Sequence, residues 1–258
     1  MPVSGRSTMP LLVARGVTKR FGAVEALVDV DFDVDAGEVV ALVGDNGAGK
    51  STLIKAIAGV QPADAGEYWL AGRRVRLRSP AEASRAGIAT VYQDLALSDN
   101  LDVVGNLYLG SEVVSRWLRT LDETAMERRT GELLASLAVT TLASPRVRVG
   151  SLSGGQRQAV AIARSLVTHP RVLILDEPTA ALGVVQTAQV LELIEHLREQ
   201  GLAIVVISHN LDNVFHVADR ISVLRLGRHA GTYDRRATAR EEIVAAITGA
   251  SPGRAVAA

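Results

Sequence analysis

The sequence predicts an α/β fold in which a largely parallel sheet is covered by helices on both faces. Apolar runs of strand length occur at residues 39–43, 171–175 and 203–208. Apart from Arg171 and Ser208 at their ends, these runs are continuously apolar rather than alternately polar, as in strands that are buried on both faces. Helical patterns separate them along the chain, and the clearest is the amphipathic segment 184–199. Buried strands that alternate with helices are typical of this fold class.

Length and composition fit a globular protein with one large domain or two small ones. Hydrophobic residues make up 48% of the 258 residues and aromatic residues 3%, so we expect a core of Val, Leu, Ile and Ala. The chain has no cysteine, which excludes disulfides and thiol chemistry and fits a reducing compartment. Its 28 basic and 28 acidic residues argue against a nucleic acid or an anionic membrane surface as partner.

No apolar run in the sequence is long enough to cross a bilayer. Residues 1–8 also lack the apolar centre of a signal peptide. We therefore expect a soluble protein, with residues 1–10 and 252–258 as flexible tails.

In the N-terminal part, short apolar stretches separated by polar turns predict antiparallel strands ahead of the first parallel strand. Ser79 followed by Pro80 predicts a helix start, because serine caps a helix and proline fits its first turn. We expect strands at 11–14, 26–34 and 39–43, a helix at 52–58, a strand at 67–70, a helix from 79 and a strand at 88–92.

Between residues 101 and 152 the pattern changes, and we expect a mostly helical insertion in the α/β frame. Residues 122–138 are amphipathic with a helical period and have an acidic first turn. The α/β frame then resumes. We expect helices at 157–167, 184–199, from 211 and at 238–247, and strands at 171–175, 203–208, 220–225 and 228–232.

The sequence GDNGAGKS at residues 44–51 lies between a buried strand and a helix, which is the context of a GxxxxGK[ST] phosphate-binding loop. Its glycines let backbone N–H groups face an anion, and the helix start adds further N–H groups and a positive dipole end. Lys50 can reach the terminal phosphates, and the Ser51 hydroxyl can bind Mg²⁺. The predicted contacts are Gly44, Asp45, Asn46, Gly47, Ala48, Gly49, Lys50, Ser51 and Thr52.

Two carboxylates, Asp176 and Glu177, follow the buried strand 171–175. Ligands of open α/β sheets bind at this carboxyl edge of the strands. Asp176 therefore suits a magnesium shell beside Ser51, and Glu177 is placed to orient and polarise an attacking water. The alternative is that the two carboxylates merely cap a helix. The phosphate-binding loop elsewhere in the chain favours the catalytic interpretation over this alternative.

The sequence LSGGQ at residues 152–156 precedes a long helical run. Ser153 is a good N-cap, and two glycines beside it allow a phosphate to approach the helix start closely. A chain with a single phosphate loop thus has a second phosphate-binding helix start, which suggests a site that another subunit completes. The residues of this second segment are Ser153, Gly154, Gly155 and Gln156.

With these motifs in this order, the chain resembles the ATP-binding cassette (ABC) ATPases over nearly its full length. LSGGQ is the signature of that family. Its pattern also includes a glutamine after a strand, a switch histidine and an aromatic residue that stacks on adenine, matched by Gln93, His209 and Phe21. Taken alone, His209 would be a surface or helix-capping residue and Phe21 a core residue.

The resemblance implies a P-loop NTPase core of RecA-like type with an antiparallel β subdomain and an inserted helical subdomain. The ATPase domain would span residues 11–251, with the ATP-binding core at 11–94 and 166–251 and the helical subdomain at 95–165. The implied cofactors are ATP and Mg²⁺. The implied catalytic residues are Lys50, Glu177 and His209, and the implied metal ligands are Ser51, Gln93 and Asp176.

The resemblance also implies partners and a location. Two cassettes, expected to be copies of this chain, would close on two ATP molecules and drive a membrane permease that works with an extracytoplasmic solute-binding protein. Residues 94–110 would form part of the groove that receives the permease. The chain would then be a peripheral subunit on the cytoplasmic face of the cell membrane.

Gly183 departs from the family pattern, which usually has aspartate in this loop between the two cassettes. We hypothesise that glycine allows a positive φ at this position. The segments 106–110, 179–183 and 207–210 resemble those of bacterial monosaccharide importers of the ribose, xylose and fructose type, which implies an importer ATPase for a sugar.

Three alternatives remain: a soluble ABC ATPase that acts on the ribosome or nucleic acid, an importer ATPase for another solute, and a regulator without turnover. The gap between Gln93 and Ser151 is too short for the long coiled coil of chromosome-maintenance relatives. The neutral charge also argues against a phosphate backbone as partner. Intact Lys50, Asp176 and Glu177 argue against a regulator.

Overall fold

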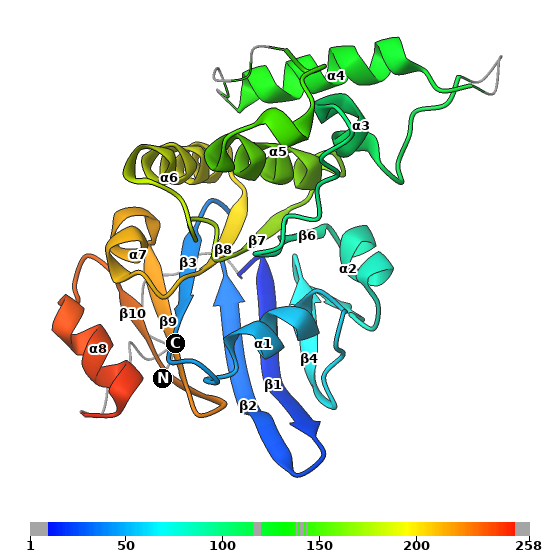
Figure 1. Cartoon of the computed structure of the whole chain (residues 1–258). Coiled ribbons are helices and arrows are strands. Elements are labelled where there is room, and N and C mark those ends of the chain that lie inside the picture. Colours follow the sequence, from blue (N-terminus) through cyan, green and yellow to red (C-terminus); the bar gives the residue numbers. More distant parts are fainter. Residues whose placement is uncertain (1–9, 116–119, 138, 140–141, 143, 251–258) are drawn as a thin grey trace.

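The structure, a computed structural model, describes residues 10–115, 120–137, 139, 142 and 144–250. Within this part the chain forms two sheets with helices packed around them (Figure 1). The central sheet has six strands in the order β10-β9-β3-β8-β7-β6, and the N-terminal sheet has four in the order β2-β1-β4-β5. The predicted α/β class is confirmed.

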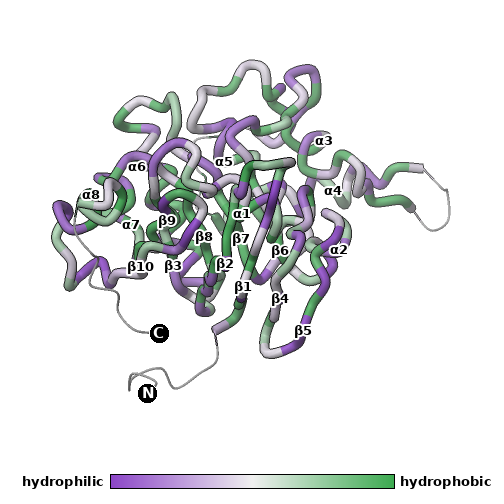
Figure 2. Tube along the Cα trace, turned by 90° about the horizontal axis from the view of Figure 1, so that it is seen from below, coloured by the Kyte–Doolittle hydropathy of each residue, from purple (hydrophilic) through white to green (hydrophobic). Residues whose placement is uncertain are grey.

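In the central sheet all neighbouring strands are parallel except β10, which pairs with β9 in antiparallel fashion. Every residue of β3 and β8 is buried, because helices or the second sheet cover both faces. Figure 2 shows the hydrophobic residues concentrated on these inner strands. The bounds are β3 Val39–Val43, β6 Ile88–Val91, β7 Val172–Asp176, β8 Ala203–Ile207, β9 Arg220–Arg225 and β10 Arg228–Asp234.

The N-terminal sheet is antiparallel, as predicted, but its strands are longer than the apolar runs in the sequence. The outer ends of β1 and β2 extend into solvent and are polar, so their sequence does not alternate clearly. Arg220 on β9 bonds to Asp33 at 3.0 Å and to Glu38 at 3.2 Å, which ties the two sheets together. The bounds are β1 Leu12–Phe21, β2 Val24–Val34, β4 Ala65–Leu70 and β5 Arg73–Val75.

Helices cover the central sheet on both faces. Helix α1 shares one hydrophobic core with the N-terminal sheet and with one face of the central sheet. Helices α5 and α6 pack on the opposite face, together with α3 and α4, and α7 and α8 cover the end near β9. The bounds are α1 Lys50–Ile57, α2 Pro80–Ala86, α5 Gly154–Leu166, α6 Val184–Glu199, α7 Leu211–Val217 and α8 Arg240–Thr248.

The insertion contains α3 (Val103–Tyr108), α4 (Glu123–Ser136) and a 3-10 turn (Val149–Ser151). The sequence did not predict α3, because six residues are too few for a helical period to emerge. The Asp102 side chain caps α3 by accepting the Gly105 N–H at 2.7 Å. Arg146 joins the two helices, since it lies 3.3 Å from Asp102 and 2.8 Å from Glu127.

Several predicted boundaries need correction. The helix predicted at 52–58 begins at Lys50, and the last helix begins at Arg240 rather than at 238. The predicted tails lie outside the described residues, apart from Pro10. The division of the chain at residues 94/95 and 165/166 stays a prediction. Among the described helices none combines the length and hydropathy that a bilayer crossing requires.

Candidate functional site

Apart from Phe21 and residues 153–156, the predicted site residues lie at or just beyond the ends of four neighbouring parallel strands. Residues 44–52 follow β3, His209 follows β8, Glu177 follows β7 and Gln93 follows β6. In the order β3-β8-β7-β6 these strands are adjacent and run in the same direction, so their carboxyl ends lie at one edge of the sheet. The strand order, which the sequence does not reveal, therefore brings the motifs to one place.

The loop between β3 and α1 is built for close backbone packing. Gly44 has φ +153°, and a Cβ there would lie 2.2 Å from the Leu224 carbonyl oxygen. Gly49, the N-cap of α1, has φ 104° and no side-chain cap. The first N–H groups of a helix have no partner in the helix itself, so this uncapped start presents donors to an anion.

Lys50 is buried at the start of α1, and its ammonium bonds to the loop itself. Its Nζ donates to the carbonyl oxygens of Gly44 at 2.6 Å and Asp45 at 3.0 Å. Burial lowers the pKa of Lys50, and the nearby charges of Glu177, Asp45 and Asp176 oppose that shift. The structure thus brings the predicted phosphate-binding lysine close to the acidic pair.

Asp176 is the half-buried end of β7. Burial raises the pKa of Asp176, and the charge of Glu177 raises it further, while Lys55 and Lys50 lower it. Tyr92 lies close by and was not predicted as a site residue. Burial raises the pKa of Tyr92, and the carboxylate of Asp176 adds to the shift. Only its place next to Gln93 could have drawn attention to it in the sequence.

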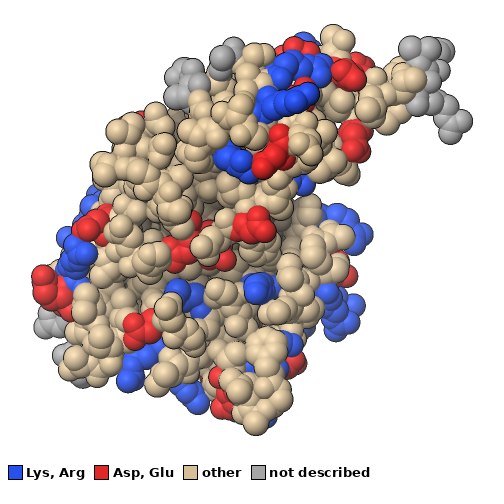
Figure 3. Space-filling view, in the orientation of Figure 1, with Lys and Arg blue, Asp and Glu red and all other residues tan. Residues whose placement is uncertain are grey.

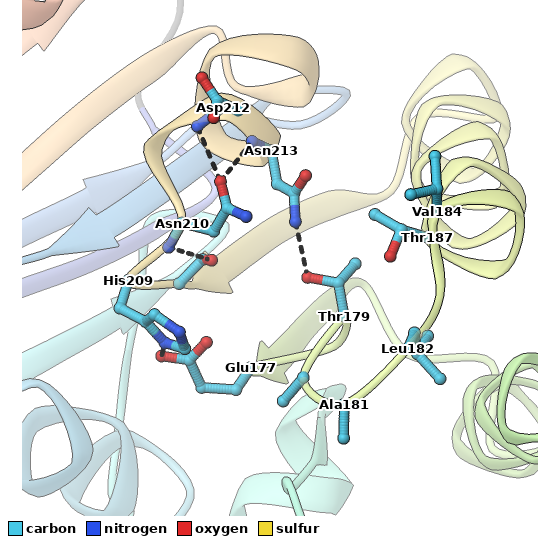
Figure 4. Close-up of a pocket in the computed structure, with 12 residues that line it drawn as sticks. Glu177, Thr179, Ala181, Leu182, Val184, Thr187, His209, Asn210, Asp212 and Asn213 are labelled. Atoms are coloured by element: carbon cyan, nitrogen blue, oxygen red, sulfur yellow. Dashed lines mark hydrogen bonds and ion pairs between the residues drawn. The ribbon is translucent and has the colours of Figure 1, made fainter.

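Glu177 and His209 are in direct contact, and their side chains point toward each other in Figure 4. His209 Nδ1 lies 2.9 Å from Glu177 Oε1, and the side chain of Glu177 is only 15% exposed, against 73% for His209. Glu177 has φ 51°, an uncommon conformation for a residue other than glycine, and such conformations cluster at functional sites. Its backbone N–H donates to the Ile207 carbonyl at 3.0 Å, which holds the turn against β8.

A cavity of about 620 Å³ opens beside this pair, between the segment 177–187 and the start of α7. Asn213 Nδ2 donates to Thr179 Oγ1 at 2.9 Å across it. Asn210, the N-cap of α7, accepts the Asp212 N–H at 2.9 Å. The sequence did not single out Thr179 and Asn213 for this role, because they come together only through the pairing of β7 with β8.

The second predicted phosphate-binding segment lies at the start of α5. Ser153 and Gln156 form a capping box, in which Ser153 N donates to Gln156 Oε1 at 2.9 Å and Gln156 N donates to Ser153 Oγ at 3.4 Å. Because α1 and α5 pack on opposite faces of the central sheet, one chain has two separate helix starts of this kind.

Four predicted residues need comment. Phe21 is 45% exposed at the end of β1, with Lys19 Nζ 5.6 Å from its ring centroid, so it is not the core residue that the sequence taken alone would suggest, and its stacking on adenine stays a prediction. Gln93 and Ser51 are exposed. Gly183 has φ −72° as the N-cap of α6, so the hypothesis of a positive φ is also wrong. The positive φ in this loop belongs to Ala181, at 59°.

Comparison with known proteins identifies the family. The family model described as ABC transporter matches residues 27–180. The fructose import ATP-binding protein FrcA of Rhizobium meliloti is 48% identical over 256 residues, covering 96% of this chain and 98% of the relative. The ribose import ATP-binding protein RbsA 1 of Rubrobacter xylanophilus is 45% identical, and the match covers 94% of this chain but 48% of that relative. The chain thus spans about half the length of the ribose protein.

Among solved structures, the dimeric structure of MJ0796, a bacterial ABC transporter cassette, has a TM-score of 0.73 and 25% identity. The similarity covers 88% of this chain and 100% of that chain. The family match, the relatives and the fold agree with the phosphate-binding loop, the acidic pair and the LSGGQ segment described above. The chain belongs to the ABC transporter family, as one of its ATPase cassettes.

Proposed function

We propose that this chain is the ATP-hydrolysing subunit of an importer for a monosaccharide. The observation that carries the hydrolytic role is the 2.9 Å contact between Glu177 and His209, beside Lys50, at the edge where β3, β7 and β8 end. Glu177 would polarise the attacking water. His209, which is exposed and touches Glu177, would interact with the reacting phosphate.

The residues present fit a nucleotide. The start of α1 has no side-chain cap, and Lys50 Nζ already bonds to two carbonyl oxygens that an anionic group could replace. Such an exchange is favourable for a buried ammonium, because a phosphate supplies the opposite charge that the carbonyl dipoles supply only in part. We therefore propose that residues 44–52 hold the phosphates and that Phe21 stacks on the adenine.

The residues also fit Mg²⁺, provided that the nucleotide shares in binding it. Ser51, Gln93 and Asp176 would supply oxygen ligands, which Mg²⁺ prefers. No group of three or more His, Cys, Asp or Glu side chains that could hold a metal occurs in the part of the chain that the structure describes. Phosphate oxygens and waters would complete the shell. When bound, the ion would neutralise charge on the transferred phosphate.

We propose that two copies of this chain form the working unit. The start of α5 would bind the nucleotide held by the partner's phosphate loop, because one chain has both helix starts on opposite faces of its central sheet. The solved structure of MJ0796, a dimer, supports this arrangement by similarity. Val184 and Val185, the first two residues of α6, are exposed and would be available for contact with the partner chain.

The solute and the membrane partner are inferred from the relatives. The two relatives are named for the import of fructose and of ribose, which favours a monosaccharide over other solutes. We propose that residues 94–110 receive a permease at the cytoplasmic face of the membrane, with a solute-binding protein outside. On the face seen in Figure 3, basic and acidic side chains are interspersed, which does not favour nucleic acid as an alternative partner.

Glu177→Gln tests the hydrolytic role. The amide keeps the shape of the side chain and loses the charge that polarises water, so ATP turnover should fall by about 10²- to 10⁴-fold while ATP binding persists. Turnover is measured with the protein assembled with its permease in liposomes, and Glu192→Gln, exposed on α6, is the control. Wild-type turnover in Glu177→Gln would contradict the role. ATP turnover that is stimulated by an amino acid and not by a monosaccharide would contradict the proposal that the solute is a sugar.

A further inference from the structure

We propose that Gln186 is a positioning residue that fixes the start of α5 to the segment that follows Glu177. The proposal rests on the proposed function, because it assumes that α5 completes the partner's nucleotide site. It concerns a residue outside the family motifs described above. Gln186 contacts two glycines that are 28 positions apart in the sequence, Gly155 and Gly183.

The first contact is steric. A Cβ built at Gly155 would lie 3.0 Å from Cβ and 3.1 Å from Cγ of Gln186, which is closer than side chains normally approach. A Cβ at Gly154 would lie 2.9 Å from Leu182 Cδ2. The two glycines of the LSGGQ segment therefore have a second reason to be glycine: they let the segment 182–186 pack directly against the backbone of α5.

The second contact is a hydrogen bond. The Gly183 N–H donates to Gln186 Oε1 at 2.9 Å, and Gly183 has no side chain with which to cap α6. The side chain of Gln186 thus does two things at once. Its aliphatic part lies against Gly155, and its amide oxygen accepts the N–H of Gly183, the N-cap of α6. Moving the side chain away from either glycine would disturb the other contact.

The segment between Glu177 and Gly183 is held by its own hydrogen bonds. Ala180 N donates to the Glu177 carbonyl at 3.1 Å, and Leu182 N donates to the Thr179 carbonyl at 3.4 Å. Asn213 holds the Thr179 hydroxyl at 2.9 Å. We infer that a turn held by these bonds moves as one unit. Gln186 would therefore keep the α5 start in register with Glu177 of the same chain.

The consequence is a link between the two nucleotide sites. In the proposed pair of chains, the start of α5 contacts the partner's nucleotide, while Glu177 acts on the chain's own nucleotide. Gln186 joins these two elements within one chain. We expect changes at Gln186 to act on ATP binding and on the cooperativity between sites more than on the chemical step.

The test compares Gln186→Ala with Gln186→Glu and with the control Gln189→Ala, which changes an exposed glutamine on the same helix. The first readout is backbone hydrogen exchange of residues 154–158 in the nucleotide-free protein. Gln186→Ala removes Cγ, which packs against Gly155, and the amide that holds Gly183, so the start of α5 loses support and this exchange should speed up about fivefold. Gln186→Glu keeps the stem and an acceptor oxygen, so it should restore slow exchange.

The second readout is ATP turnover of the assembled complex as a function of ATP concentration. Gln186→Ala should raise the KM for ATP about fivefold and lower the Hill coefficient, with a smaller change in kcat. Gln186→Glu should retain both. Equal hydrogen exchange in Gln186→Ala and Gln189→Ala would overturn the positioning role. Faster exchange with unchanged KM and Hill coefficient would overturn the link between sites.

The two readouts separate this inference from the proposed function. Hydrogen exchange needs no nucleotide, so it reports the contact between Gln186 and α5 even in a protein that hydrolyses nothing. A wild-type complex without ATP turnover would contradict the proposed function and, with it, the link between sites. Slow exchange restored by Gln186→Glu would still confirm the contact.

Discussion

The starts of α1 and α5 both carry glycines, and the structure builds them in different ways. At α1 the N-cap is Gly49 with no side-chain cap, and Lys50 is buried beside it. At α5 the N-cap is Ser153 in a complete capping box, and its glycines pack against Leu182 and Gln186. An uncapped helix start keeps donors for a ligand, whereas a capped one satisfies them within the chain.

The difference indicates unequal roles for the two segments. In the proposed function, the uncapped α1 start would offer its free donors and the charge of Lys50 to a bound ligand. The capped α5 start would present a preformed surface to a ligand held by another chain.

Lys50→Ala should have the largest effect, a loss of ATP turnover of about 100-fold or more, because a preorganised charge at the reacting phosphates is removed. The measurement is ATP hydrolysis by the assembled complex, together with nucleotide binding by the isolated chain. Lys55→Ala, on the same helix and also close to Asp176, is the control for total positive charge. Equal losses in both variants would contradict a specific role for Lys50.

Asp176→Asn should reduce turnover and raise the thermal unfolding midpoint at neutral pH. The pKa of Asp176 is raised above its ordinary value of 3.8, mainly by burial, so the folded state favours the protonated carboxyl. Its contribution to stability is present at low pH and is lost as the pH rises through the raised pKa. The gain in Asp176→Asn should therefore shrink as the pH falls through the raised pKa toward 3.8, and it should be absent at lower pH.

Thermal unfolding between pH 3 and 8, roughly the range over which a carboxyl with a raised pKa titrates, checks this dependence. Glu192→Gln removes an exposed carboxylate of α6 and is the control. A gain in Asp176→Asn that stays the same at every pH would contradict the assignment to this carboxyl.

Ser153→Ala should destabilise the start of α5 by about 1 kcal/mol, because it removes the side-chain half of the capping box. Urea unfolding measures the loss, and Ser165→Ala in the last turn of α5 is the control. No comparable residue caps α1 at Gly49. If Ser153→Ala cost nothing, the contrast between a capped and an uncapped start would be wrong.

Gly183→Asp should have the smallest effect, a gain of a few tenths of a kcal/mol, because aspartate is a better N-cap than glycine. The backbone at Gly183, with φ −72° and ψ 168°, accepts an ordinary residue without strain. Urea unfolding of Gly183→Asp is compared with Gly183→Ala, which adds a Cβ but no capping oxygen. A clear loss of stability in Gly183→Asp would mean that the added side chain displaces Gln186.

Much of this protein is determined by local sequence. The strand, loop and helix around residues 39–57, the capping box at Ser153 and the carboxylates after β7 each depend on a few consecutive residues. Apolar periodicity and capping signals act over such short spans, so the sequence predicts them. It misses α3 and β5, because elements of six and three residues are too short to show a period.

Tertiary structure decided the contacts between distant segments. Glu177 meets His209 because β7 and β8 are neighbours, and Phe21 is exposed because β1 extends beyond the core. Gln186 lies against Gly155 because α5 and α6 pack on the same face of the central sheet. Strand order and helix packing are set by burial of the whole apolar surface at once, which no short stretch of sequence encodes.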